Sequence, residues 1–258
     1  MSSKKKIDWF GSSTLAQWGQ LPRHILELES LGVVTRTFRR LDPEAQRGVV
    51  GGILEESKTR GPTGVTLRGV AARAKVSVGS LYSYFGSREM LIRFAVELCA
   101  RYMVDLMAMA GPFMRGMPLR DGLRMYLATG LELMEGAVPM MEFFGRAAYA
   151  GDGGLQDSVV RPVAEAMLAA LQTMLEGARD RGELRAGLDF PATVRVVNTL
   201  LTVAADGQLL PHLNAYLQTT GGEVDRPRMV EALVELVLSG VGAVASPPMP
   251  GRKGKAKS

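Results

Sequence analysis

Apolar residues recur along this chain at spacings of three and four, the period that places them on one face of a helix. Alternating runs of β-branched and aromatic residues, which would indicate strands, are almost absent. Clusters of glycine and proline divide the pattern into separate segments. The chain is therefore expected to be all-α, with helices over 43–60, 67–73, 78–84, 88–110, 119–135, 138–149, 155–181, 191–217 and 228–243.

The two ends of the chain are harder to interpret. Residues 1–42 carry too many apolar side chains for a plain disordered arm, and a short helix or two is expected near 13–31. Two interpretations remain open for this N-terminal extension: it packs onto the body of the protein, or it is a basic arm that touches DNA or a partner. Residues 246–258 are rich in Pro, Gly and Lys, a composition typical of a basic disordered tail.

The clearest local signal is the segment 61–91, GPTGVTLRGVAARAKVSVGSLYSYFGSREML. Thr66 and Ser77 are each placed to cap a short helix, and only about three residues separate the first helix from the second. Small apolar residues in the first helix let the two helices approach closely. This spacing predicts a helix-turn-helix, in which the second helix is supported by the first and presented outward.

The second helix of this motif combines packing residues with polar ones. Leu81 and Phe85 are four residues apart and are expected to anchor the helix inward. Tyr82 and Tyr84 can each reach a DNA phosphate through the phenolic hydroxyl, and Arg88 would neutralise another. Small and hydroxyl-bearing residues let a helix enter a major groove, and the residues expected to stay available for this are Val78, Gly79, Ser80, Ser83 and Tyr84.

The segment 66–91 resembles the DNA-binding segment of TetR-type transcriptional regulators. The residues in register are Thr66, Val70-Ala71, Val76-Ser77, Leu81-Tyr82, Tyr84-Phe85, Arg88-Glu89 and Leu91. The resemblance implies base-edge contacts from Arg68, Val78, Gly79, Ser80 and Tyr84, and backbone contacts from Thr66, Ser77, Tyr82 and Arg88. It also implies a three-helix DNA-binding domain over 43–94 and a larger helical domain for ligand binding and dimerisation over 95–245.

Two residues depart from the family pattern. Lys75 stands where the family usually has glycine in the turn, a position that often needs a positive φ, and a non-glycine residue there should cost on the order of 1 kcal/mol. Lys75 is also positioned to add a phosphate contact. Arg88 replaces the usual lysine, which keeps the charge and changes its geometry.

The C-terminal half resembles the family in architecture more than in sequence. The stretch 182–210, GELRAGLDFPATVRVVNTLLTVAADGQLL, resembles the segment that begins a dimerisation helix in many members, including the pair Asp206-Gly207. Together with the apolar helix over 228–243, the helix over 191–217 would form a four-helix interface across a two-fold axis. A homodimer is also what reading a palindromic operator in double-stranded DNA requires.

Methionine is abundant between residues 103 and 174. Most of these side chains are expected to be ordinary core, since methionine fills irregular space. A second interpretation is a pocket for a small apolar or amphipathic effector. Its lining would be Met103, Met107, Met125, Phe143, Phe144 and Met174, with Asn198 or Asp206 as a polar anchor.

Charge and composition narrow the class of protein. Residues 1–100 hold 15 Lys and Arg against 9 Asp and Glu, whereas residues 101–250 hold 12 against 17, so the N-terminal part is the one suited to a polyanion. With two His and one Cys, the chain offers no His/Cys metal cluster, and it lacks a phosphate-binding loop ending in Lys-Ser or Lys-Thr and a Gly-x-Ser-x-Gly elbow. No enzyme activity, cofactor or metal is expected.

The remaining expectations concern location and the competing function. Cys99 is the single cysteine, which excludes an internal disulfide and fits a reducing cytoplasm. No apolar run reaches the roughly 18 residues of a membrane span, so no membrane association is expected. The resemblance implies a ligand-responsive transcriptional regulator, a repressor that binds a palindromic operator as a homodimer and is released by a small apolar or amphipathic ligand. The alternative is a helical protein-interaction module of the same fold that lacks specific operator binding.

Overall fold

The computed structural model describes residues 19–61, 64–129, 138–149, 151 and 156–243. Every regular element in these ranges is a helix, and the only β pairings among them are isolated bridges. The helices are α2 (Leu21–Ser30), α3 (Arg36–Arg39), α4 (Pro43–Arg60), α5 (Leu67–Ala74), α6 (Val78–Phe85), α7 (Arg88–Arg115), α8 (Leu119–Thr129), α9 (Val138–Tyr149), the π-helix η2 (Gln156–Val160), α11 (Arg161–Asp180), α12 (Phe190–Leu209), α13 (Pro211–Leu217) and α14 (Arg226–Val241). The all-α prediction is confirmed.

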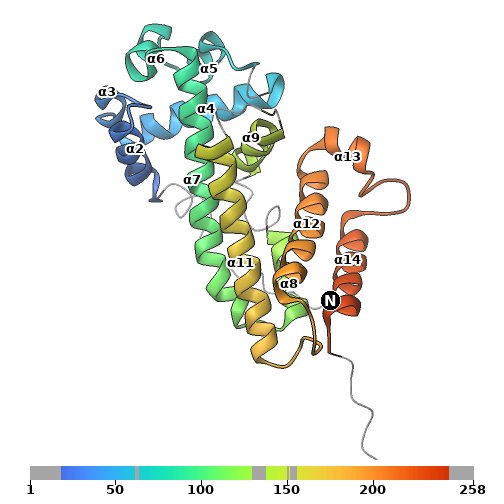
Figure 1. Ribbon diagram of the computed structural model, residues 1–258. Helices are drawn as coiled ribbons and strands as arrows, with labels where there is room; N and C mark the ends of the chain where they lie inside the picture. Colours follow the sequence, from blue (N-terminus) through green and yellow to red (C-terminus); the bar gives the residue numbers. More distant parts are fainter. Residues whose placement is uncertain (1–18, 62–63, 130–137, 150, 152–155, 244–258) are drawn as a thin grey trace, which may run out of the picture.

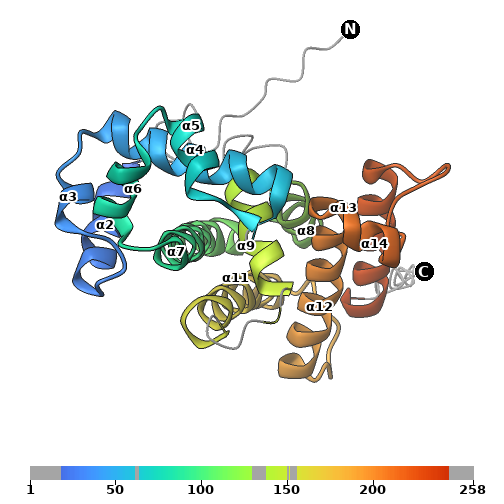
Figure 2. The same ribbon diagram turned by 90° about the horizontal axis from the view of Figure 1, so that it is seen from above.

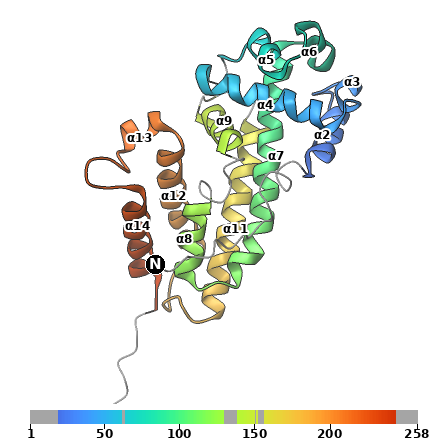
Figure 3. The same ribbon diagram turned by 180° about the vertical axis from the view of Figure 1, so that it is seen from behind.

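Helix α7 runs through the whole molecule and connects its two ends. Helices α2 to α6 gather around its N-terminal part, while α11 lies alongside it and α8, α12 and α14 complete the opposite end (Figures 1 and 3). Where α7 and α11 cross, a Cβ added at Gly177 would lie 2.2 Å from the carbonyl oxygen of Arg115, so only glycine permits this approach.

The expected end of this helix at residue 110 is wrong, because α7 continues through Gly111 and Pro112 to Arg115. Proline removes one intrahelical hydrogen bond, a loss that the last turn tolerates. Packing favours the extra turn: Met114 is buried at 1% exposure in the core shared with α11. A Cβ added at Gly111 would make ordinary contact with Ala170 at 3.4 Å.

Helices α2 and α3 belong to the body of the protein. Leu21, Ile25, Leu28 and Phe38 are buried in one continuous apolar cluster with the helix-turn-helix residues. Figures 1 and 2 show the pair beside α6 and the upper part of α7. Of the two interpretations of the N-terminal extension, residues 19–42 follow the packed one; residues 1–18 lie outside the described part.

The predicted helix over 191–217 is two helices. Leu210 has φ −116° and ψ 100°, an extended conformation between α12 and α13. The cause is Pro211, whose ring disfavours the helical conformation in the residue before it. The helix predicted over 155–181 starts as the π-helix η2 before it becomes α11. The described part of the helix predicted over 119–135 ends at Thr129, and the tail predicted over 246–258 falls outside the described residues.

Two apolar cores result from this arrangement. One contains side chains of α2 to α6, the N-terminal half of α7, and α9; the other lies between the C-terminal end of α7 and helices α8, α11, α12 and α14. None of the described helices combines the length and apolar character that a bilayer span requires.

Candidate nucleic-acid interface and apolar cavity

Helices α5 and α6 form the predicted helix-turn-helix. The Thr66 hydroxyl caps α5 by accepting a hydrogen bond from the Gly69 amide at 3.1 Å. The Ser77 hydroxyl caps α6 in the same way, accepting from the Ser80 amide at 2.9 Å. Both predicted caps are confirmed, and α5 ends at Ala74, so residues 75–77 alone make the turn.

The turn places Lys75 in the left-handed region, with φ 56° and ψ 39°. This is the backbone conformation expected for a position where glycine is usual. The amide of Lys75 bonds back to the carbonyl of Ala71, which closes the end of α5. The Lys75 side chain is exposed beside α6.

The predicted DNA-binding residues differ in exposure. Those with exposed side chains or surfaces are Arg68, Lys75, Ser77, Gly79 and Tyr82, the last with 53% of its surface accessible. Those that are half-buried are Thr66, Val78, Ser80 and Arg88. The segment that carries them lies at one end of the molecule (Figure 1).

The expectation that Tyr84 stays available on the surface is wrong. Its residue is 8% exposed, and its ring packs against Phe38 and Phe85 at centroid distances of 5.6 and 6.2 Å. The reason is helix α3, which covers this side of α6 and which the motif alone does not reveal. Tyr84 therefore contributes to the core of this domain.

A groove between α4, α5 and α6 brings several of the predicted residues together with further arginines. Its basic side chains are Arg60, Arg68, Arg73 and Arg88, and the exposed ring of Tyr82 lies along it. The single carboxylate in its lining, Glu56, is buried and already paired, with Arg60 at 3.2 Å and Arg73 at 3.0 Å. The groove therefore presents a net positive surface to a polyanion.

Arg88 also has a structural role in this groove. Its Nε donates a hydrogen bond to the carbonyl oxygen of Val65 at 2.7 Å, which links the start of α7 to the residue before the α5 cap. The Arg88 side chain is 38% exposed, so it remains accessible to a phosphate. A planar guanidinium can make both contacts at once, whereas an ammonium is a single point charge.

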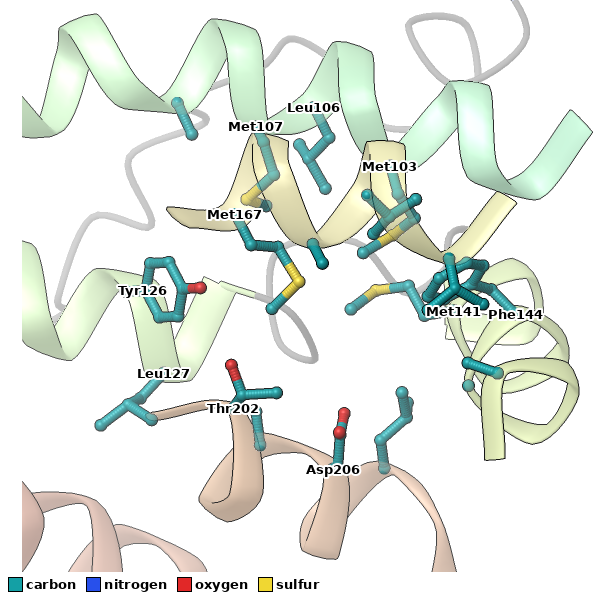
Figure 4. A pocket seen from close by; sticks show the side chains of 18 of the residues that line it. Met103, Leu106, Met107, Tyr126, Leu127, Met141, Phe144, Met167, Thr202 and Asp206 are labelled. Carbon is teal, nitrogen blue, oxygen red and sulfur yellow. The ribbon is translucent and has the colours of Figure 1, made fainter. Parts of the chain in front are cut away.

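The second candidate site is an apolar cavity of about 310 Å³ lined by residues of α7, α8, α9, η2, α11 and α12 (Figure 4). Five of the residues predicted for it line it: Met103, Met107, Met125, Phe144 and Asp206. The thioethers of Met141 and Met167 also reach it. A mainly apolar lining with a few polar groups is typical of small-molecule sites.

Three predicted lining residues are corrected. Phe143 is fully buried in the core next to the DNA-binding helices, because neighbouring residues of a helix point to different sides and Phe144 takes the side facing the cavity. Met174 packs against Gly122 of α8, where its sulfur would lie 2.6 Å from an added Cβ. Asn198 sits on α12 one turn before Thr202 and outside the lining.

Polar groups gather on one wall of the cavity. The Tyr149 hydroxyl donates to the Asp206 carboxylate at 2.5 Å. Burial raises the pKa of Asp206, although the Tyr149 hydrogen bond opposes this, and burial also raises the pKa of Tyr149 and Tyr126. The hydroxyls of Tyr126 and Thr202 are buried, and neither has a partner at hydrogen-bonding geometry within the described residues.

Sequence reasoning missed Tyr126, Tyr149 and Thr202 as lining residues. Thr202 had a usable signal, since it precedes Asp206 by four residues on the same helix and so shares its face. The tyrosines come from α8 and α9, and their approach to α12 depends on tertiary packing. No group of three or more His, Cys, Asp or Glu within the described residues is arranged to hold a metal ion.

An exposed apolar stripe follows one face of α12. Val196, Leu200 and Val203 are 60%, 39% and 38% exposed, at helical spacings of four and three. Leu236 on the neighbouring helix α14 is 62% exposed. Helices α12 and α14 lie side by side at the edge of the molecule away from α7 (Figures 1 and 2).

Comparison with known proteins agrees with this geometry. The family model for bacterial regulatory proteins of the tetR family matches residues 52–93, which include α5, α6 and the start of α7. No match was found among curated proteins.

Solved structures share the fold at low sequence identity. A TetR-family transcriptional regulator from Chloroflexus aurantiacus J-10-FL is 18% identical, with a TM-score of 0.55 over 82% of this chain and 99% of that one. SmeT, the repressor of a multidrug efflux pump of Stenotrophomonas maltophilia, is 18% identical, with a TM-score of 0.55 over 80% and 100%. FadR from Bacillus subtilis, in complex with stearoyl-CoA, is 16% identical, with a TM-score of 0.56 over 75% and 98%. Residues 52–93, which contain the helix-turn-helix, thus match the tetR family of bacterial regulatory proteins, and most of the chain shares the fold of solved tetR-family regulators.

Proposed function

We propose that this protein is a ligand-responsive repressor that binds a palindromic operator as a homodimer and leaves it when a small apolar or amphipathic molecule occupies the cavity. The observation that carries the proposal is the presentation of α6: capped by Ser77, backed by α5 and flanked by the basic groove. It acts by binding and not by catalysis.

The DNA-binding surface is proposed to divide into two roles. Val78, Gly79 and Ser80 form the N-terminal turn of α6, the part of a recognition helix that reaches base edges, and Arg68 on α5 is proposed to reach a base edge beside them. The residues proposed to hold phosphates are Thr66, Lys75, Ser77, Tyr82 and Arg88. Phosphate contacts set affinity and salt dependence, while base contacts set sequence preference.

Self-association is proposed through α12 and α14. The stripe formed by Val196, Leu200 and Val203 would be covered by the same stripe of a second copy across a two-fold axis, as an isologous interface requires. Two recognition helices related by such an axis read two half-sites of an inverted repeat.

The effector is proposed to have an apolar body and one polar end. The methionines and Phe144 offer an adaptable apolar surface. Asp206, Thr202 and Tyr126 offer acceptors and donors on the facing wall, and a ligand that hydrogen-bonds to these buried groups would be favoured. A group that donates a hydrogen bond or carries a positive charge would satisfy Asp206.

Release of the operator is proposed to work through α7. This helix contributes Met103 and Met107 to the cavity, and its N-terminal end follows the helix-turn-helix directly. A ligand changes operator affinity only if it prefers one spacing of the recognition helices over another.

The deciding experiment is selection of binding sites from a random DNA pool with the full-length protein at two salt concentrations. Enrichment of an inverted repeat is the expected result, and it also supplies the operator for effector screening. Salt-sensitive binding without an enriched motif, or no binding at all, would reject the operator reader and favour the protein-interaction module.

A further inference from the structure

Helix α3 is attached to the C-terminal end of the recognition helix. The Thr35 hydroxyl donates to the carbonyl oxygen of Ser83 at 2.8 Å, and the Thr35 amide donates to the carbonyl oxygen of Tyr84 at 2.9 Å. The carbonyls of the last turn of a helix have no partner within that helix. The residue that precedes α3 therefore satisfies two carbonyls of α6 and fixes α3 beside it.

Aromatic packing makes this attachment rigid. Phe38 is fully buried, and its ring lies 5.6 Å from that of Tyr84, 5.2 Å from that of Phe85 and 5.3 Å from that of Phe94, measured between centroids. These partners belong to α6 and α7, so one side chain of α3 contacts both. Helix α3 is therefore packed against both the recognition helix and α7.

Helix α2 holds the other side of α3 against α7. Asp105 of α7 accepts a hydrogen bond from Arg23 and lies 3.1 Å from Nε2 of His24. Arg101 of α7 lies 3.4 Å from the carboxylate of Glu27. Charged contacts thus hold α2 against α7, and aromatic contacts hold α3 against α6 and α7.

Two exposed arginines lie one helical turn apart at the two ends of α3: Arg36, its first residue, and Arg40, its C-cap. Neither has an ion-pair partner in the part of the chain that the structure describes. Arg39, between them, is half-buried and paired with Glu29. One arginine thus stabilises the fold, whereas Arg36 and Arg40 are exposed to solvent. Helix α3 itself lies beside α6 (Figure 2).

We propose that α3 is part of the DNA-binding surface, with Arg36 and Arg40 contacting operator phosphates just beyond the bases that α6 reads. The N-terminal residues of a recognition helix enter the groove, so its C-terminal end lies toward the edge, where the sugar-phosphate backbone passes. Helix α3 is bonded to that end. The inference rests on the proposed operator binding and extends its footprint outward.

The test uses the full-length protein and the operator recovered by selection. The variants are Arg36→Ala/Arg40→Ala and the charge-preserving Arg36→Lys/Arg40→Lys. The control is Arg185→Ala, an exposed arginine of the loop after α11, at the opposite end of the molecule. Affinity is measured across a salt series for the operator and for unrelated DNA.

Each phosphate contact contributes about 0.9 to the slope of log affinity against log salt concentration. The double alanine variant should lower the magnitude of this slope by roughly 1.8, weaken binding to both DNAs alike, and select the same motif as wild type. The lysine variant and Arg185→Ala should keep the wild-type slope. A double alanine variant with the wild-type slope and an unchanged melting temperature would overturn the proposal.

The two proposals fail in different ways. A wild-type protein that enriches an inverted repeat, together with an unchanged slope in the double variant, rejects the role of α3 alone. A wild-type protein without an enriched motif rejects operator reading. A melting temperature lowered in the double alanine variant and not in the lysine variant, with slopes unchanged, would assign Arg36 and Arg40 to stability.

Discussion

The hydroxyl of Thr66 donates to the carboxylate of Glu56 across 3.0 Å, which joins α4 to the first residue of the helix-turn-helix. The same carboxylate accepts from Arg73 of α5 at 3.0 Å, although Glu56 is only 3% exposed. One buried charge thus fixes the angle between the supporting helix and the motif that it supports.

Replacing this carboxylate should loosen the domain. Glu56→Gln keeps the shape and removes the charge, and we expect a loss of about 2 kcal/mol in the free energy of unfolding. Urea denaturation followed by circular dichroism measures it. The matched control is Glu55→Gln, whose exposed carboxylate pairs with Lys58 and should change stability by less than about 0.5 kcal/mol. Equal losses in both variants would contradict the role of Glu56.

The left-handed turn at Lys75 predicts opposite effects on folding and on DNA affinity. Lys75→Gly relieves backbone strain but adds entropy to the unfolded chain, so stability should rise by about 0.5 kcal/mol. Lys75→Val, with a branched side chain at the same φ, should lose at least about 1 kcal/mol. The glycine variant should bind DNA with a salt slope smaller by about 0.9, since the proposed phosphate contact of Lys75 would be lost.

Substitutions at Tyr82 and Arg68 should affect DNA binding differently: the first should lower affinity alone, and the second should also lower sequence selectivity. Tyr82→Phe removes one hydroxyl from an exposed ring and should weaken binding to all DNA sequences alike, by roughly three- to tenfold. Arg68→Ala and Ser80→Ala should also relax the preference at particular base pairs, by about 1–3 kcal/mol each. Competition assays with single-base operator variants measure both effects. Unaltered selectivity in Arg68→Ala would remove Arg68 from the base contacts.

Asp206 predicts a pH-dependent contribution to stability. Burial raises the pKa of its carboxyl in the folded protein, so its contribution is most favourable below the unfolded pKa of about 3.9 and is lost as pH rises through the folded value. The unfolding free energy of Asp206→Asn relative to wild type should therefore increase from about pH 4 toward neutrality.

The exposed stripe on α12 predicts the oligomeric state. Leu200→Glu would bury two unpaired carboxylates in the proposed interface and should weaken self-association by at least about 100-fold, close to 3 kcal/mol. Light scattering after gel filtration should then give the mass of one chain instead of two. Met109→Glu, at a methionine of α7 that is 58% exposed, should leave the mass of the dimer unchanged.

The helix-turn-helix could be predicted from sequence because its determinants are local. Two caps, Thr66 and Ser77, and a three-residue turn fall within a short segment, and each is recognisable from neighbouring residues alone. The burial of Tyr84 could not be predicted in this way. It depends on Phe38, which lies 46 positions earlier in the numbering and reaches Tyr84 only in the folded chain.

The lining of the cavity could likewise be predicted only in part from the sequence. Methionine abundance indicated the correct helices, but the side on which each residue points follows from helix phase. Phe143 and Phe144 are adjacent in sequence, and only the second faces the cavity. The tyrosines of α8 and α9 depend on how three helices meet, which periodicity within one helix does not specify.

Helix α7 connects the cavity to the helix-turn-helix and can transmit a tilt from one to the other. Met107, at the cavity, and Arg88, at the recognition unit, belong to one uninterrupted helix. Nineteen residues at about 1.5 Å each separate them by about 28 Å, so a tilt of about 5° pivoting at Met107 would carry Arg88 through roughly 2.5 Å. In a two-fold dimer the two copies of α7 would double this change in spacing. Under the proposed release mechanism, a sub-ångström adjustment around a bound effector would be magnified to the scale of a hydrogen bond at the DNA.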